Sequence, residues 1–286
     1  MIRVAGAPIS WGVCEVPGWG HQMAPERVLA EMRDAGLSAT EFGPDGFLPA
    51  DPQERTDLLA SYGLTAVGGF VPVVLHEPGH DPLPDVQRAL AGFGPARTLV
   101  LAAATGTDGY DQRPDLTAEG WRTLLANLDR IAAAAGEDGR TTVLHPHIGT
   151  MVERTDEVER VLAGSGVGLC LDTGHLLAGG TDPAVLARAA ASRIAHVHVK
   201  DVDAKAAQQV REGAITYTEA VRGGMYRPLG RGDVDLAGIV AALDAAGYDG
   251  WYVMEQDTVL DAEPAAGEGP LADVQASLEH LRQVSS

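Results

Sequence analysis

The amino-acid sequence predicts one domain of the α/β class, in which parallel strands alternate with helices. Short apolar runs alternate with helical patterns along all 286 residues, and no linker or change of composition divides the chain. Eight strand–helix pairs of about 35 residues each fit this length, which suits βαβ units. A closed barrel and an open doubly wound sheet both have this pattern. The open sheet usually carries a Gly-rich phosphate turn after its first strand, and residues 10–14 (SWGVC) lack one.

The predicted strands are short runs that are apolar on both faces. This pattern is typical of parallel strands that helices cover on both sides. In chain order the strands are expected at residues 2–9, 37–42, 64–74, 97–103, 141–145, 167–171, 194–198 and 250–254.

Apolar residues at helical spacing predict a helix after each strand. In the first helix, Pro25 lies near the start and Gly36 follows the end, as is usual for these two residue types. The clearest helix is 118–135, where Trp121, Leu124 and Leu128 share one face. The other helices are expected at residues 52–62, 86–93, 156–163, 183–191, 236–246 and 271–284.

The composition excludes two classes of partner. Lys and Arg number 21 against 40 Asp and Glu, which gives a formal charge of −19. This charge repels nucleic-acid phosphates, whose binding proteins gain affinity from Lys and Arg. No apolar run approaches the roughly 18 residues of a membrane-spanning helix. The first residues lack a signal-peptide layout, and two cysteines cannot form a disulfide framework, so we expect a cytoplasmic protein without nucleic-acid or membrane partners.

Residue types that bind metals follow four consecutive strands of the second half. They lie in residues 145–147 (HPH), 172–175 (DTGH), 196–201 (HVHVKD) and 255–257 (EQD). In a barrel, the carboxyl ends of the strands meet at one rim, where active sites lie. Mixed nitrogen and oxygen donors suit a divalent ion. We expect one ligand from each strand, namely His145, Asp172, His198 and Glu255, with His147 as the alternative to His145.

We expect His196 to point away from His198 and to serve in packing or to support the ligands. Cys14 and Cys170 are interpreted as small packing residues. The long polar segment 201–231 follows a ligand-bearing strand, so it is either a lid over the site or a contact between subunits of a homo-oligomer. Asp233 is expected to cap the helix that begins near Leu236.

Several segments resemble the xylose isomerase-like TIM barrels. Residues 171–175 (LDTGH) and 196–201 (HVHVKD) resemble motifs of this superfamily, which includes sugar isomerases and epimerases, endonuclease IV and myo-inosose-2 dehydratase. The segments that resemble the inosose dehydratase branch are 7–12 (APISWG), 40–43 (TEFG), 145–150 (HPHIGT) and 228–235 (PLGRGDVD). The resemblance covers nearly the whole chain and implies a single (β/α)8 TIM barrel over residues 1–286.

The resemblance also implies one metal ion, usually Mn²⁺ or Co²⁺, with Zn²⁺, Fe²⁺ and Mg²⁺ as alternatives. Asp172, His198 and Glu255 match three ligand positions, and His175 matches a substrate-contacting histidine. Related epimerases have a Glu where this chain has His145, and they move a proton between that Glu and the strand-eight Glu. Their substrate-binding Arg has no clear counterpart here, since Ala204 falls near that place.

The histidine at position 145 favours elimination with one base over epimerisation with two. Two carboxylates and two imidazoles leave a divalent site neutral, which strengthens it as a Lewis acid. Together with the resemblance to inosose dehydratases, this implies a metal-dependent lyase that removes the α-proton and then water from a keto-inositol, 2-keto-myo-inositol. Glu255 or Glu41 would take the proton, and a protonated histidine would donate one to the leaving hydroxyl. The candidate donors are His175 and His147.

Substrate-binding roles are expected for Trp11, His175 and Lys200. Trp11 and Trp19 either pack against a sugar-like ring or close the mouth of the barrel. Lys200 either neutralises oxygen charge near the ion or forms a surface ion pair with Asp201. Glu41 either transfers a proton or anchors the first loop.

Four other functions compete with the keto-inositol lyase. A metal-dependent sugar or sugar-phosphate isomerase or epimerase is the first alternative, and a β-eliminase of 3-keto-glycosides is a related lyase. An endonuclease for abasic DNA needs more metal ligands and a basic surface, which the charge of −19 disfavours. A non-catalytic sugar-binding barrel is disfavoured by the intact ligand positions. The partner expected in each enzymatic case is a small polyol or keto-sugar.

Overall fold

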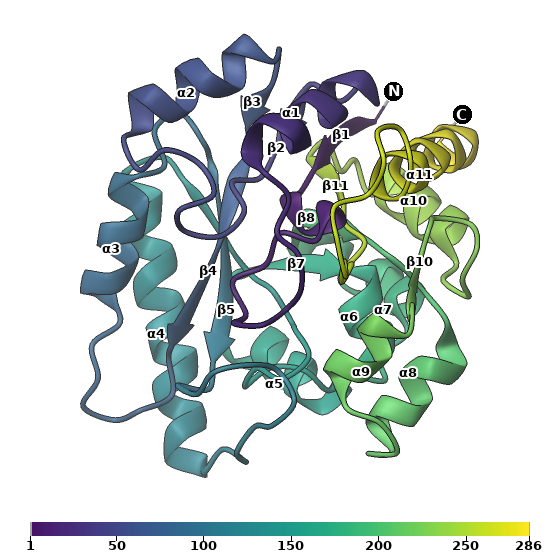
Figure 1. Ribbon diagram of the computed structural model, residues 1–286. Coiled ribbons are helices and arrows are strands. Elements are labelled where there is room, and N and C mark those ends of the chain that lie inside the picture. The colour runs from purple at the N-terminus through teal and green to yellow at the C-terminus, as the bar shows by residue number, and fades with distance from the viewer. Residues whose placement is uncertain (1, 286) are drawn as a thin grey trace.

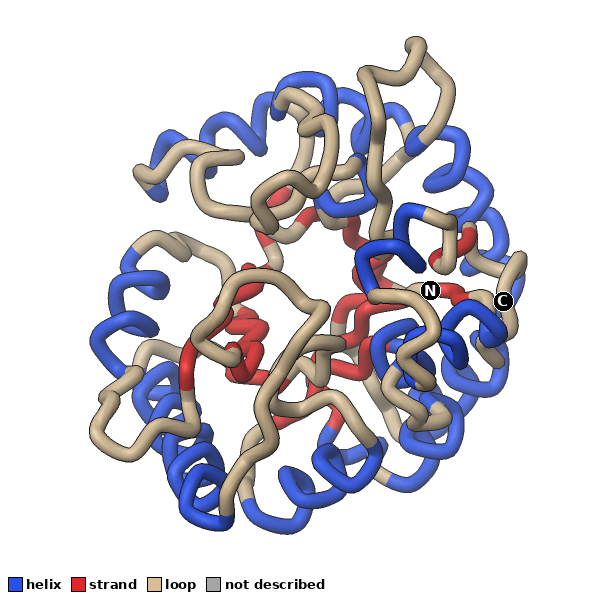
Figure 2. The backbone as a smooth tube through the Cα atoms, turned by 60° about the horizontal axis from the view of Figure 1, so that its bottom comes forward, coloured by secondary structure: helices blue, strands red, loops and turns tan. Residues whose placement is uncertain are grey.

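A ring of parallel strands forms the centre of the protein, and helices surround it (Figures 1 and 2). The computed structural model describes residues 2–285. Within them the main sheet has nine strands in the order β3-β2-β1-β11-β8-β7-β6-β5-β4. Their bounds are β1 Arg3–Gly6, β2 Ala39–Thr40, β3 Thr65–Ala66, β4 Gly68–Val74, β5 Thr98–Ala104, β6 Thr141–Leu144, β7 Gly168–Asp172, β8 Ile194–Val199 and β11 Trp251–Met254.

The strands β3 and β4 are two parts of one bent strand. Counted in this way, the nine strands of the described chain form an eight-stranded barrel. Only Val67 separates them. The Val67 N–H donates to the Thr40 carbonyl on one side (3.0 Å), and its carbonyl accepts the Thr98 N–H on the other (3.1 Å). β3 pairs with β2, and β4 pairs with β5. The ring is therefore closed at Val67 and Gly68, whose carbonyl accepts the Phe42 N–H, and β4 is unpaired with this side of the sheet beyond Gly68.

Helices follow the strands and cover the outside of the barrel (Figure 2). Their bounds are α1 Pro25–Asp34, α2 Pro52–Ser61, α3 Leu83–Ala91, α4 Ala118–Glu137, α5 Thr155–Gly164, α6 Thr173–Ala178, α7 Pro183–Ala189, α8 Ala204–Arg211, α9 Tyr217–Arg222, α10 Leu236–Ala245 and α11 Pro270–Val284. Two short 3-10 helices, Pro8–Trp11 and Ala191–Arg193, complete the set in the described residues.

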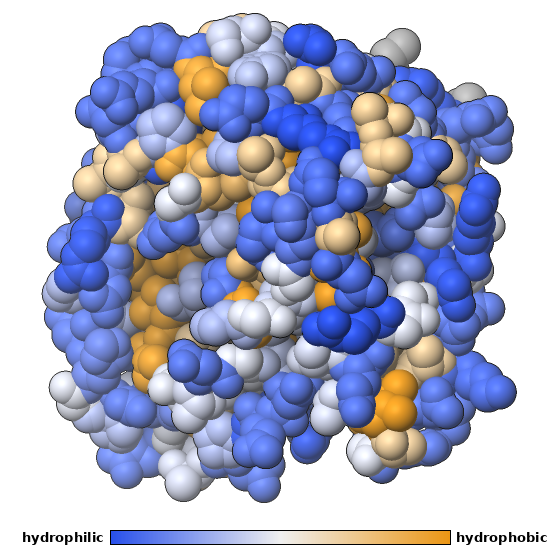
Figure 3. Space-filling view, viewed as in Figure 1, coloured by the Kyte–Doolittle hydropathy of each residue, from blue (hydrophilic) through white to orange (hydrophobic). Residues whose placement is uncertain are grey.

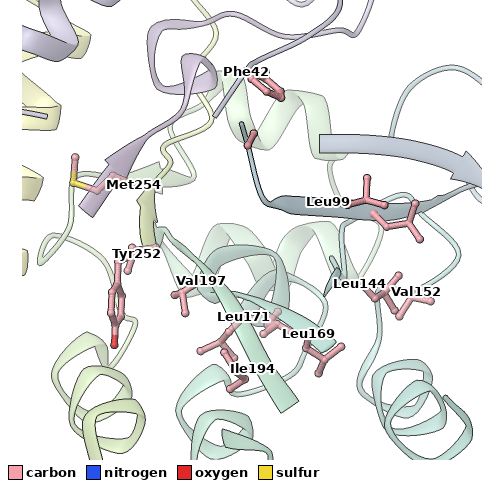
Figure 4. Packing of buried hydrophobic residues seen from close by; sticks show 14 of the residues in the cluster. Phe42, Leu99, Leu144, Val152, Leu169, Leu171, Ile194, Val197, Tyr252 and Met254 are labelled. Atoms are coloured by element: carbon pink, nitrogen blue, oxygen red, sulfur yellow. The ribbon is translucent and has the colours of Figure 1, made fainter. Parts of the chain in front are cut away.

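Amphipathic helices and apolar strands meet in one large core. In α4 the Thr117 side chain caps the first turn by accepting the Gly120 N–H, and the helix buries Leu124, Leu128 and Ile131 completely. Strand residues from β6, β7 and β8 pack against one another in the same core (Figure 4). The labelled members include Leu144, Leu169, Leu171 and Val197. This core fixes the strands whose carboxyl ends carry the candidate site.

The structure confirms the α/β barrel and each strand and helix expected from the sequence, with ends that differ by a few residues. Four elements of the polar segment were not expected: β9 Asp201–Val202, α8, α9 and β10 Tyr226–Arg227. The expected cap of α10 is wrong, because Asp235 accepts the Gly238 N–H there, whereas Asp233 accepts the Ala204 N–H. Among residues 2–285, no helix combines the length and the hydropathy needed to span a membrane.

An ion pair at the start of α5 leads to a prediction about stability. The Arg113 guanidinium donates two hydrogen bonds to Glu157, with N···O distances of 2.9 and 2.7 Å, and two backbone N–H groups donate to the same carboxylate. Burial raises the pKa of Glu157, but these donors outweigh it and hold the pKa below its ordinary value. Because the unfolded carboxyl has the higher pKa, its stabilising contribution is present at neutral pH and is lost as the pH falls through the folded-state pKa.

We expect Glu157→Gln to lower the free energy of unfolding by about 1–2 kcal/mol at neutral pH and by much less at strongly acidic pH. Urea unfolding curves at both pH values measure the difference. The control is Glu159→Gln, since Glu159 lies exposed on the same helix. If Glu157→Gln lowered the free energy of unfolding equally at both pH values, the ionised Glu157 carboxylate would not be the source of the stabilisation.

Candidate metal site and cavity

A cavity of about 610 Å³ opens at the carboxyl ends of the barrel strands. Ionisable side chains from several strands or the loops after them line one end of it: Glu41, His145, His147, His198, Lys200, Glu255 and Asp257. Each of these side chains is at most 9% exposed. Buried ionisable groups that converge in a cavity are the usual mark of a functional site in a barrel.

Three of the expected ligands, His145, His198 and Glu255, line this end of the cavity, and the fourth, Asp172, is completely buried beside the two histidines. Asp172 Oδ2 is 3.1 Å from His145 Nε2 and 3.5 Å from His198 Nδ1. His198 Nδ1 is in turn 3.2 Å from Glu255 Oε2. Each residue comes from a different strand or the position after it, so the parallel arrangement of β6, β7, β8 and β11 creates the cluster.

The spacing of these donors fits a bound divalent ion. Donors about 2.0–2.2 Å from one ion lie roughly 3.0–3.5 Å apart in tetrahedral or octahedral geometry. The three donor pairs given above have this spacing, and the ligand atoms of Asp172, His198 and Glu255 all lie within 4.8 Å of one another. His145 belongs to neighbouring groups, one with Asp172 and His175 and one with Cys170 and His198. His198 Nδ1 is buried and makes no aligned hydrogen bond within the described residues, although two carboxylates face it. A buried polar atom without a partner calls for a physical explanation, and a shared cation supplies one.

The electrostatics of the cluster favour added positive charge. Burial lowers the pKa of His198, but Cys170 and the Glu255 and Glu41 carboxylates outweigh burial and raise it well above its ordinary value. Burial also opposes ionisation of Asp172 and Glu255, yet nearby cations lower both pKa values. Burial lowers the pKa of His145 and keeps its imidazole neutral, which is the form that binds a metal.

Glu41 supports the ligand His198 from behind. Its Oε1 atom accepts hydrogen bonds from Nε2 of His196 at 2.8 Å and from Nε2 of His198 at 3.0 Å. A carboxylate on the second nitrogen of a metal-binding histidine fixes the ring and its tautomer. The geometry therefore favours a positioning role for Glu41 over the expected role as proton acceptor.

The expectation that His196 points away from His198 is wrong. Both rings lie on the same side of β8, with centroids 5.3 Å apart, and both contact Glu41. The physical reason is the two-residue period of a strand, which places residues 196 and 198 on one face. His196 also belongs to a second group with ligand-type atoms close together, formed with Glu41 and His198.

Lys200 lies at the centre of a buried polar network. Its ammonium is 2.6 Å from Asp257 Oδ1, 2.9 Å from His175 Nε2 and 3.0 Å from Glu255 Oε2. Burial lowers the pKa of Lys200, but the surrounding carboxylates outweigh burial and keep it well above the ordinary value. The surface ion pair expected with Asp201 is wrong, because Lys200 is buried and Asp201 accepts backbone N–H groups of residues 230–234.

His147 and His175 stack at the same end of the cavity, with ring centroids 3.7 Å apart. His147 lines the cavity, and its Nδ1 is 2.7 Å from the Ile148 carbonyl, so Nδ1 carries the proton of the neutral ring. The His175 ring makes two hydrogen bonds. Its Nε2 atom is 2.9 Å from the Lys200 ammonium, and its Nδ1 atom is 3.2 Å from the Tyr226 hydroxyl. Burial and neighbouring positive charge lower both histidine pKa values well below the ordinary range.

The two tryptophans occupy different places. Trp11 is completely buried in the main core and donates its indole N–H to Glu31 at 2.8 Å, so the structure does not place it in the cavity lining. Trp19 lines the cavity and donates to the Thr258 carbonyl at 3.0 Å. A substrate-binding role for Trp11 therefore has no structural support, whereas the first loop does reach the cavity through Trp19.

Three residues of the site were missed at the sequence level. Asp257 was recognised as a strand-end residue but not selected, although it is the nearest carboxylate to Lys200. Tyr217 on α9 donates its hydroxyl to Asp257 at 2.7 Å and lines the cavity. Tyr226 on β10 contacts His175. Both tyrosines come from segment 201–231, which therefore forms part of the cavity wall, but no pattern in a single sequence marks them.

Comparisons with known proteins show the family of the chain. The model of the family described as "Xylose isomerase-like TIM barrel" matches residues 29–284. The inosose dehydratase of Geobacillus thermodenitrificans is 30% identical over 269 residues, which are 90% of each chain. The rhizopine catabolism protein MocC of Rhizobium meliloti is 34% identical over 273 residues, covering 90% of this chain and 82% of that protein.

Solved structures share the fold at lower sequence identity. An L-ribulose 3-epimerase superposes with a TM-score of 0.72 at 18% identity, over 100% of this chain and 95% of that one. The IOLI protein, whose structure is described with a zinc atom, superposes with a TM-score of 0.72 at 13% identity. The match covers 100% of this chain and 98% of that one. The resemblance inferred from the motifs is thus confirmed: the chain belongs to the xylose isomerase-like TIM barrel family.

Proposed function

We propose that the protein is a metal-dependent hydro-lyase that removes water from a keto-inositol, 2-keto-myo-inositol. The observation that carries the proposal is the group of Asp172, His198 and Glu255 at the polar end of the cavity, whose ligand atoms lie within 4.8 Å of one another, with His145 3.1 Å from Asp172. The names of relatives that are about 30% identical over 90% of the chain support a dehydratase reaction.

The four ligands would hold one divalent ion, with Mn²⁺ or Co²⁺ as the first candidates. Two imidazoles and two carboxylates also suit Zn²⁺ and Fe²⁺. When bound, such an ion supplies Lewis-acid stabilisation of the oxygen charge that develops as a proton leaves the neighbouring carbon.

Glu255 would take the α-proton. Its carboxylate lines the cavity, and a lowered pKa keeps it ionised and able to accept. The electrons of the broken C–H bond form a carbon–carbon double bond as the β-hydroxyl departs. The carboxylate then donates this proton to the departing hydroxyl, which leaves as water. A single residue therefore acts first as the base and then as the acid. The Lys200 ammonium, 3.0 Å from Glu255, stabilises negative charge on the substrate oxygen.

The structure changes the role that we propose for the histidines. Since the Nδ1 proton of neutral His147 faces a carbonyl, its Nε2 is an acceptor and becomes a donor only after it gains a proton. His175 is bonded at both nitrogens and buried, so we assign it to positioning Lys200.

An epimerase is the second candidate. Glu255 and His147 are two proton-accepting groups on the same cavity, as exchange of a proton between the two faces of a substrate requires. The related fold of an L-ribulose 3-epimerase is compatible with this reaction.

Incubation with 2-keto-myo-inositol and Mn²⁺ or Co²⁺ tests the proposal. Loss of water should yield a conjugated diketone that absorbs ultraviolet light, with one product formed per substrate consumed. Ketoses such as fructose and tagatose serve as the comparison substrates. Turnover of a ketose without any water loss from the keto-inositol would overturn the dehydratase and leave the epimerase.

Asp257→Asn is expected to lower kcat by about 10–100-fold with a smaller change in KM. Asp257 holds the Lys200 ammonium at 2.6 Å, so its neutral replacement weakens the position and charge of that group. Steady-state kinetics measure the effect, and Asp261→Asn is the control because the Asp261 side chain is 93% exposed in the same loop. If the two variants had the same kcat and KM, the ion pair between Asp257 and Lys200 would not be needed for activity.

A further inference from the structure

The cavity is larger than a keto-inositol requires. A volume of about 610 Å³ is typical of pockets that hold drug-sized ligands, whereas a keto-inositol is a single six-membered ring. Ionisable groups crowd one end of the cavity. The other end, which we call the apolar annex, is lined by Phe42, Leu48, Phe70, Val71, Val73 and Phe93.

A break in the barrel wall creates the annex. β4 pairs with β5 along all seven of its residues, whereas β2 has only two residues and pairs with β3 and β1. In the described chain, β4 therefore has a free edge beyond Gly68, whose carbonyl accepts the Phe42 N–H. Phe70, Val71 and Val73 of β4 line the cavity, and so does Phe42 from the chain that follows β2, so the cavity reaches this free edge.

The walls of the annex favour an apolar ring. Phe42 and Phe93 meet edge to face, with centroids 5.2 Å apart. The Phe70 ring lies 5.8 Å from the His145 ring and 5.9 Å from the His147 ring, so it stands where the annex meets the polar end. In Figure 3, hydrophobic residues lie at the bottom of a recess beside α3. Aromatic walls of this kind bind rings by contact area and by edge-to-face geometry.

Two arginines that line the cavity near the annex already have partners. Arg88 donates to Asp85 at 2.9 Å. Arg55 donates to the Pro49 and Gly92 carbonyls and lies over the Phe42 ring at 4.4 Å. Because these cations are engaged within the protein, they do not select an anionic substituent.

We propose that the annex binds an apolar, ring-sized substituent of the substrate, so that the protein acts on keto-polyols that carry such a group. The inference rests on the proposed function, which places the keto-polyol at the polar end. The substituent then extends sideways through the break between β2 and β4, along Phe70.

Binding of two unreactive probes tests the proposal. We expect the monophenyl ether of myo-inositol to bind at least about tenfold more tightly than myo-inositol, by isothermal titration calorimetry in the presence of Mn²⁺. Ala89→Phe on α3 places a ring in the annex, because Ala89 lines it, and should abolish this gain without changing the binding of myo-inositol. Ala91→Phe is the matched control, since Ala91 lies exposed on the same helix.

If the unaltered protein bound both probes with equal affinity, the annex would not bind the phenyl ring. The same conclusion would follow if the Ala89→Phe variant bound both probes less tightly. The comparison on the unaltered protein does not depend on the folding of any variant. Failure of the proposed function is a separate result, namely no water loss from 2-keto-myo-inositol. Tighter binding of the phenyl ether would support the annex even then.

Discussion

Glu255→Gln is expected to lower kcat for the dehydration of 2-keto-myo-inositol by about a thousandfold or more. The amide has nearly the shape of the carboxylate but cannot accept the α-proton, and it is a weaker ligand for a divalent ion. Initial rates at saturating Mn²⁺ measure the chemical contribution with the least interference from metal affinity.

The control for Glu255→Gln is Glu268→Gln, an exposed carboxylate in the following loop. It should leave kcat within about twofold, since surface substitutions rarely have larger effects. Circular dichroism establishes that both variants are folded. A Glu255→Gln variant that keeps more than about a tenth of the activity would exclude Glu255 as the base.

His198→Gln is expected to weaken Mn²⁺ binding by about a hundredfold or more. His198 is the ligand with carboxylates on both sides: its Nδ1 faces Asp172 and Glu255, and its Nε2 donates to Glu41. The substitution removes the nitrogen donor and the link to the supporting carboxylate. Titration with Mn²⁺, followed by electron paramagnetic resonance of the free ion, gives the affinity.

His196→Gln is the matched variant for this measurement. His196 stands two residues away on the same strand and shares the Glu41 carboxylate, but it lies outside the proposed ligand set. We expect its effect on Mn²⁺ affinity to stay below about tenfold. An equal loss of affinity in both variants would instead place the ion among Glu41, His196 and His198.

The barrel could be predicted from the sequence because its signals are local and repeated. Each buried parallel strand is an uninterrupted apolar run, and each helix has its own spacing and boundary residues. Strand ends could therefore be located to within a few residues, and the barrel architecture brings those ends together. His145, Asp172, His198 and Glu255 were predicted in this way. The structure brings Asp172, His198 and Glu255 close together and places His145 against Asp172, and the binding of one ion by all four stays a prediction.

Side-chain directions and distant partners could not be predicted as well. The two-residue period of a strand places His196 beside His198 on one face of β8, as the structure shows. The partners of Lys200 were not predictable, because Asp257 and Tyr217 reach the network from the loop after β11 and from α9. Trp11 was misplaced for a similar reason, since its partner Glu31 lies on α1 and draws the indole into the core.

The apolar annex depends on an interruption of strand pairing that has no sequence signal of its own. β2 ends at Thr40, although the apolar run was predicted to continue to Phe42. The chain then leaves the sheet, and the edge of β4 becomes part of the cavity. Such a break follows from the packing of the whole barrel rather than from local propensity.

Anomalous diffraction from crystals grown with Mn²⁺ tests the central claim most directly, namely that four strand-end side chains bind one ion. The account predicts a single strong anomalous peak within roughly 2.0–2.3 Å of His145 Nε2, Asp172 Oδ2, His198 Nδ1 and Glu255 Oε2. A peak elsewhere in the cavity, or none at these four atoms when Mn²⁺ is saturating, would contradict it.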